Sequence, residues 1–201
     1  MNNTIIALSS AQGTGAIAVV RMSGESAFSI FAKSINKDNF TFEHSQVKRF
    51  EIFDKNGDVI DDVMVVAFFA PKSFTGENVV EIFCHGSPIT IERIIKRMIE
   101  LGANLAGKGE FTKRAFLNGK IDLHKAEAIN AVIAANDYYS HKNAMSQYLG
   151  AGREFFDKIK ENLQEILADI ESQIEFSETD DLGEDNKNYE KLQKLLKKLC
   201  L

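Results

Sequence analysis

The chain has 201 residues, of which 44% are hydrophobic, and its 24 basic and 29 acidic residues give a formal net charge of −5. This composition is typical of a globular protein of one or two domains and excludes a disordered tail. The acidic balance argues against nucleic-acid binding over the whole surface, so that any RNA contact is expected to be local.

Short runs rich in Val, Ile and Phe, bounded by Gly, Asn, Asp and Ser, occupy the first 120 residues and predict β-strands at 4–9, 15–22, 46–53, 59–69 and 78–84. An Asn56-Gly57 pair between the third and fourth runs predicts a hairpin. Apolar residues at helical spacing predict a helix that begins near Gly24, a second at 88–101 and a short third at 110–117.

After Lys120 the strand signals disappear. Apolar residues at helical spacing over 123–148 and 151–176 predict two long helices. We expect a charged, solvated connection at 175–185 and an amphipathic stretch at 189–201. The apolar stripe of that last stretch ends abruptly and needs a partner, which suggests a piece of a longer protein. The predicted fold class is α+β, with a mixed-sheet domain at 1–120 and an all-helical segment at 121–201.

The chain has no long apolar segment and few cysteines. The longest apolar run, 63–70, is too short to cross a membrane, and the N-terminus lacks the features of a secretory signal. The cysteines are Cys84 and Cys200, so we expect a cytoplasmic protein without a structural disulfide. His85 follows Cys84, but the other histidines are scattered, and we expect no metal site.

Two strand residues are candidates for binding. Arg21 ends an apolar strand and either reaches water or meets an anionic or planar ligand. Strand alternation places Glu81 on one face with Val79 and Phe83, where a carboxylate needs a partner. That partner is either a cation such as Arg21 or the N–H donors of a ligand.

Two glycine-containing segments are also candidates. The loop at 9–15 is either a tight turn or a place where a ligand approaches the backbone. It is not a phosphate-binding P-loop, because no Gly-x-x-x-x-Gly-Lys-[Ser/Thr] motif occurs in the chain. The segment 109–123 gathers three cations and two aromatic residues around Asn118-Gly119, and it is either a solvated surface or an anion pocket.

Together, these motifs resemble the N-terminal part of the MnmE (TrmE) family. The matching runs are GTGAIAVVRMSG at 13–24, SFTGENVVE at 73–81, His85-Gly86, the segment 109–123, and AEAI at 126–129. The resemblance implies an N-terminal domain that binds a tetrahydrofolate derivative, either 5-formyl- or 5,10-methylene-tetrahydrofolate, and dimerises. Its fold is expected to resemble the folate domain of an aminomethyltransferase. A helical domain, interrupted by a G domain, is expected to follow.

The resemblance further implies a tRNA-modifying GTPase. With the flavin-bearing partner MnmG (GidA), the family adds an aminomethyl-type group to carbon 5 of the tRNA wobble uridine, using a one-carbon unit from folate. The family's folate contacts correspond here to Arg21, Glu81 and Lys120, and no catalytic residue is assigned to this chain. GTP, K⁺ and Mg²⁺ belong to the G domain, which is absent here, so we expect no GTP hydrolysis by this chain alone.

The sequence departs from the family pattern in three places and leaves other functions open. Ser10 and Ala11 replace prolines of the first loop, Ser87 replaces a glycine, and the Cys-x-Gly-Lys tail of the family is absent. An alternative function is a dimerisation and docking module for MnmG and tRNA with no folate role of its own. A separate aminomethyltransferase is disfavoured, because the chain continues as helices and shows no candidate catalytic acid.

Overall fold

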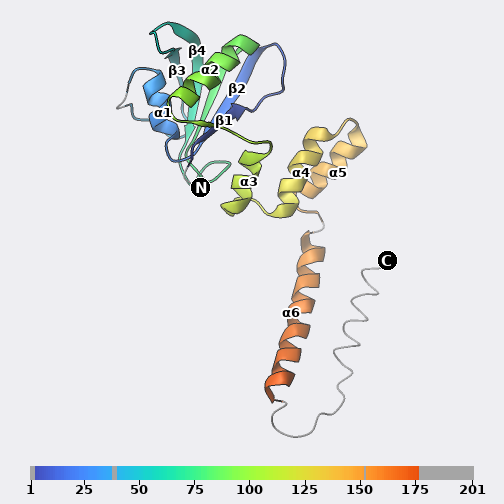
Figure 1. Cartoon of the computed structure of the whole chain (residues 1–201). Helices are drawn as coiled ribbons and strands as arrows, with labels where there is room; N and C mark the ends of the chain where they lie inside the picture. Colours follow the sequence, from blue (N-terminus) through green and yellow to red (C-terminus); the bar gives the residue numbers. More distant parts are fainter. Residues whose placement is uncertain (1–2, 38–39, 152, 177–201) are drawn as a thin grey trace. The chain divides into compact units, whose positions relative to one another are not determined.

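The computed structural model describes residues 3–37, 40–151 and 153–176. The chain divides into two compact units, Met1–Ala126 and Glu127–Leu201. The first unit contains a six-stranded sheet with three helices, and the rest of the described chain is helical (Figure 1). The α+β fold class predicted from the sequence is therefore confirmed.

The sheet has the strand order β3-β4-β5-β2-β1-β6. Neighbouring strands pair antiparallel, except β1 and β6, which are parallel. The strands are β1 (Ile5–Leu8), β2 (Gly15–Ser23), β3 (Val47–Phe53), β4 (Val59–Phe68), β5 (Val79–Gly86) and β6 (Asn104–Leu105). The first five match the predicted runs closely, and the two-residue β6 was not predicted.

The predicted hairpin joins β3 to β4. Asp54 N donates to the carbonyl oxygen of Asp58 at 2.9 Å, and Gly57 has a φ of 90°. A glycine adopts this left-handed conformation without the steric cost that a Cβ brings. The Asn-Gly signal therefore located the turn correctly.

One face of the sheet carries the hydrophobic core. Helices α1 (Ala27–Ser34) and α2 (Pro88–Glu100) cover this face. Phe31 of α1 and Ile94 of α2 are fully buried with Val20 and Ile82 of the central strands. Pro88 begins α2, where its missing N–H has no helical partner to lose, and Gly102 follows the helix end with a φ of 113°. Both predicted helices are confirmed.

The other face of the sheet is covered at one end only, and we call it the open face. At the covered end Ser23 and Val79 are buried, and Oγ of Ser23 lies 2.7 Å from Oγ1 of Thr75 in the loop at 69–78. Beyond them the face is exposed at Ile17 of β2 and Met64 of β4. Helix α3 (Glu110–Leu117) lies at the covered end and brings Phe111 to 5.6 Å from the guanidinium of Arg21.

The later helices are α4 (Leu123–Ala134), α5 (Tyr138–Tyr148) and α6 (Arg153–Phe176). The prediction of one helix over 123–148 is wrong, because the helix breaks before Asp137. The Asp137 side chain accepts from the backbone N–H groups of Tyr139 and Ser140, both at 2.9 Å, and thereby caps a new helix. The cap starts a new helix at this point, although apolar residues continue at helical spacing across the break.

The predicted connection at 175–185 overlaps α6 by two residues and otherwise lies outside the described residues, as does the amphipathic stretch at 189–201. Cys84 is buried and free, and Cys200 lies outside the described residues. Among the helices that the structure describes, none combines the length and apolar character that a membrane span requires.

Candidate functional site

Two predicted site residues form an ion pair on the open face. Arg21 of β2 and Glu81 of β5 lie directly opposite each other in the antiparallel ladder. Nε and Nη2 of Arg21 lie 2.8 and 2.7 Å from Oε1 of Glu81. The side chains retain 25% and 18% exposure, so the pair is accessible from solvent. Of the two partners that the sequence left open for Glu81, the structure therefore shows Arg21.

The pair retains hydrogen-bonding capacity toward a ligand. Both contacts from Arg21 reach Oε1, and no residue in the described part of the chain donates a hydrogen bond to Oε2 of Glu81. Phe74 and Phe111 lie 5.4 and 5.6 Å from the guanidinium carbon of Arg21. The arrangement combines an acceptor oxygen with an aromatic wall, which suits a planar molecule that carries N–H donors.

The loop at 69–78 links this pair to the third predicted site residue. Nζ of Lys120 donates to the carbonyl oxygen of Pro71 at 2.9 Å. A Cβ added at Gly76 would lie 3.1 Å from Cγ of Lys120, so the lysine stem crosses the loop at a glycine. The same loop carries Phe74 to Arg21. Arg21 and Glu81 are thus in contact, whereas Lys120 is connected to them through this loop.

Arg114 of α3 holds the covered end together, and the sequence analysis did not distinguish it from its neighbouring cations. Its side chain is 1% exposed and bonds to Glu77, Glu110 and Asn3. Oε2 of Glu77 in turn accepts from Oγ of Ser23 at 2.7 Å. This network fixes the loop that carries Phe74 to the end of β2.

Glu110 is the second carboxylate of this network. The N–H of Gly107 donates to it at 2.7 Å and is the largest influence that lowers the pKa of its carboxyl, assisted by Arg114. The four-residue spacing of Glu110 and Arg114 on a predicted helix was the available signal that these two residues pair. The burial of Arg114, in contrast, depends on Asn3 and Glu77, which are distant from it in sequence.

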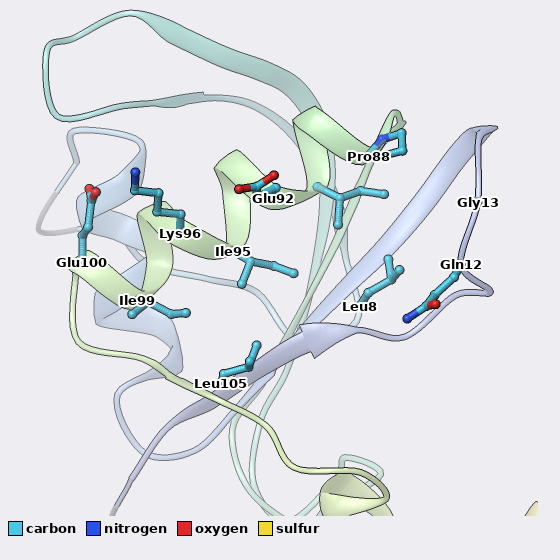
Figure 2. Close-up of a pocket in the computed structure, with 11 residues that line it drawn as sticks. Leu8, Gln12, Gly13, Pro88, Glu92, Ile95, Lys96, Ile99, Glu100 and Leu105 are labelled. Atoms are coloured by element: carbon cyan, nitrogen blue, oxygen red, sulfur yellow. The ribbon is translucent and has the colours of Figure 1, made fainter.

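A separate cavity of about 800 Å³ lies on the helix-covered side of the sheet (Figure 2). Ile95 and Ile99 of α2 line it together with Leu8 and Leu105 of the strands, and Gln12 of the first loop lies at its edge. Because this cavity is on the opposite side of the sheet from Arg21 and Glu81, it does not belong to the predicted site. Its lining is mostly apolar.

Two family models match the chain, one over its N-terminal part and one over its helical part. The model described as GTP-binding protein TrmE N-terminus matches residues 4–120, and the model of the MnmE helical domain matches residues 123–200.

Curated relatives carry the name tRNA modification GTPase MnmE. The relative from Sulfurimonas denitrificans is 45% identical over 183 residues, which cover 91% of this chain and 40% of the relative. The relative from Aliarcobacter butzleri is 41% identical over 200 residues, which cover 100% of this chain and 44% of the relative. The relative from Fervidobacterium nodosum is 40% identical, with 90% of this chain and 40% of the relative covered. The chain thus spans about 40% of the length of these relatives.

Proposed function

The chain belongs to the MnmE family, and from that premise we propose that residues 1–120 form a tetrahydrofolate-binding and dimerisation domain. Residues 121–201 then form the first part of a helical domain in a longer, cytoplasmic tRNA-modifying GTPase. In that protein this chain contributes the folate site, and GTP, K⁺ and Mg²⁺ bind elsewhere. Together with MnmG the whole protein adds an aminomethyl-type group to carbon 5 of the tRNA wobble uridine.

The observation that carries the folate proposal is the position of Glu81. A pterin ring presents an amino group beside a ring N–H, and a carboxylate accepts such a pair as it accepts the fork of an arginine. Among the described residues none donates to Oε2 of Glu81, which leaves it open to such donors, and Arg21 holds the carboxylate in place. When bound, the folate supplies a one-carbon unit.

The surroundings of Glu81 fit the shape of the pterin. Phe74 and Phe111, which contact the guanidinium of Arg21, give an aromatic wall against which a flat ring can pack. Lys120 lies across the same loop and is placed to attract the electron-rich formyl oxygen or the anionic part of the folate. These residues therefore fit the cofactor that the family implies.

The open face also supports the dimer proposal. Val19, Phe83 and Met64 lie opposite one another on three neighbouring strands and form an apolar row, and Ile17 is largely exposed beside it. A single sheet face contacts a bound ligand on one side only. A second copy of the chain placed over this row covers the other side of the ligand and removes the apolar row from water. Substituting Met64→Lys should convert a dimer to a monomer in light scattering, and a dimer that persists contradicts this interface.

Isothermal titration of the chain with 5-formyl-tetrahydrofolate tests the folate proposal. We expect micromolar binding, which corresponds to about −8 kcal/mol. Glu81→Gln keeps the size of the side chain but removes its charge, and it should weaken binding about tenfold or more, because a hydrogen bond to a charged group contributes about 1.5–3 kcal/mol. Glu51→Gln, an exposed carboxylate on β3, is the matched control and should bind as the unaltered chain does.

Two results contradict the proposal. One is equal affinity in the Glu81→Gln and Glu51→Gln variants. The other is no binding to the unaltered chain at millimolar folate, which favours the alternative function, a docking module for MnmG and tRNA.

A further inference from the structure

Two Asn-Gly pairs occur in the chain, Asn56-Gly57 and Asn118-Gly119. This pair is prone to spontaneous deamidation, because glycine has no side chain to shield its backbone nitrogen. The glycine nitrogen gives up its proton and attacks Cγ of the asparagine, ammonia leaves, and a five-membered succinimide ring forms. Water then opens the ring at either carbonyl carbon. The net change is asparagine plus water to aspartate or isoaspartate plus ammonia, with no oxidation or reduction.

The two pairs lie in different elements of the first unit. Gly57 is at the tip of the hairpin between β3 and β4, and Gly119 follows the end of α3. Both glycines are in the left-handed region, with φ of 90° and 67°. A Cβ added to either glycine would meet no atom within 4 Å. Free space around the glycine therefore does not distinguish the two pairs, whereas their hydrogen bonds do.

The side chain of Asn118 is held by the loop at 69–78. Its Nδ2 donates to the carbonyl oxygen of Thr75 at 2.7 Å, and Thr75 is fully buried. The N–H of Gly119 donates to the carbonyl oxygen of Phe116 at 3.0 Å. Ring closure turns the asparagine side chain toward the following peptide group, so at Asn118 it breaks the bond to Thr75 as well as the bond from Gly119.

The side chain of Asn56 is not held in this way. It is exposed at the hairpin tip, and among the residues that the structure describes none forms a hydrogen bond with its amide. The backbone N–H of Gly57 donates to the carbonyl oxygen of Asp54 at 3.2 Å, which is the long end of the usual range for such bonds. Ring closure at Asn56 therefore breaks this long bond and no side-chain bond within the described part of the chain.

We propose that Asn56 is a site of spontaneous deamidation in the folded protein, and that the hydrogen bond to Thr75 protects Asn118 from the same reaction. The product places a further carboxylate between Asp54 and Asp58, whose backbone groups close the hairpin at 2.9 Å. Isoaspartate also adds one carbon to the backbone at the tip. At Asn118 a carboxylate would have no N–H to donate to the carbonyl of Thr75, so protection there preserves the link between α3 and the loop.

The test follows both pairs in one molecule. The full chain is kept at mildly alkaline pH, folded in one sample and unfolded in guanidinium chloride in the other. Digestion at acidic pH with a protease that cleaves after glutamate leaves each pair inside its own peptide, 52–77 and 111–127. Mass spectrometry measures the conversion of amide to acid in each peptide, and chromatography separates the aspartate and isoaspartate forms, which have equal masses.

The expected result is a difference that depends on folding. In the unfolded sample both peptides should convert at similar rates, because both contain Asn-Gly. In the folded sample Asn56 should convert about tenfold faster than Asn118, the effect on a rate of one additional hydrogen bond that the reaction must break. Asn56→Gln is the matched control, since glutamine closes a larger ring slowly. It should abolish conversion in peptide 52–77 and leave peptide 111–127 unchanged.

The other outcomes overturn the inference. Equal conversion of the two pairs in the folded chain shows that the bond to Thr75 does not protect Asn118. No conversion of Asn56 in the folded chain, with conversion after unfolding, shows that the hairpin tip is itself protected. Because the experiment contains no folate, its result is independent of the proposed function.

Discussion

Replacing Arg114 by Met removes the cation at the centre of the network that holds the covered end of the sheet. Glu77 and Glu110 then lose the cation with which both of them pair. Removing one partner of a fully buried ion pair costs about 3–5 kcal/mol. Glu77 and Glu110 keep 17% and 23% exposure, and each retains another donor, Ser23 Oγ and Gly107 N respectively, both at 2.7 Å. We therefore expect the low end of that range, a loss of about 3 kcal/mol.

Native-state hydrogen exchange of the sheet amides measures this loss in the N-terminal unit separately from the helices. Arg114→Lys keeps the charge but not the fork, and it should lose about half as much. The matched control is Arg93→Met, because Arg93 is 44% exposed and pairs with Asp54 at 3.2 Å. The loss in this variant should stay below about 1 kcal/mol. If Arg114→Met and Arg93→Met lose the same stability, the reasoning about the buried network is refuted.

Three further predictions concern separate parts of the chain. Because Asp61 raises the pKa of His85 above 6.5, the stability that this pair adds is complete below that pH and is lost as pH rises through the raised pKa. As the pH rises above 6.5, the urea midpoint should fall more in the unaltered chain than in His85→Gln, and parallel profiles contradict this. Asp137→Ala should cost about 1 kcal/mol, seen as faster amide exchange in α5; unchanged exchange argues against the cap. Gly86→Ala should lower the free energy of unfolding by about 1–3 kcal/mol, because the added Cβ would lie 2.5 Å from the carbonyl oxygen of Gly15 and force β2 and β5 apart. Thermal unfolding measures this loss, and a variant as stable as the unaltered chain contradicts the prediction.

Local patterns predicted most of the first unit. Strand alternation alone placed Glu81 on one face with Val79 and Phe83, where a carboxylate needs a partner, and left Arg21 as one of its two possible partners. The ladder pairs Glu81 with Arg21. The Asn56-Gly57 turn was equally local. Such features depend on backbone conformations and periodicities that act over a few residues, so a single sequence is sufficient for them.

Other features depend on contacts that no local pattern encodes. The burial of Arg114 requires Asn3 and Glu77, which are 111 and 37 residues away in sequence. The position of Lys120 across the loop at 69–78 is equally non-local. The break before Asp137 did have a local signal, the Asp-x-x-Ser spacing of a helix cap, but apolar residues at helical spacing on both sides concealed it. That the three predicted site residues bind folate remains a prediction.

A crystal structure of the chain with 5-formyl-tetrahydrofolate tests the central claim most directly. The account predicts the pterin edge within hydrogen-bond distance of Glu81 and its ring beside Phe74 and Phe111. A ligand bound instead in the cavity beside α2 (Figure 2), or any bound position that leaves Glu81 without a contact to the pterin, contradicts it.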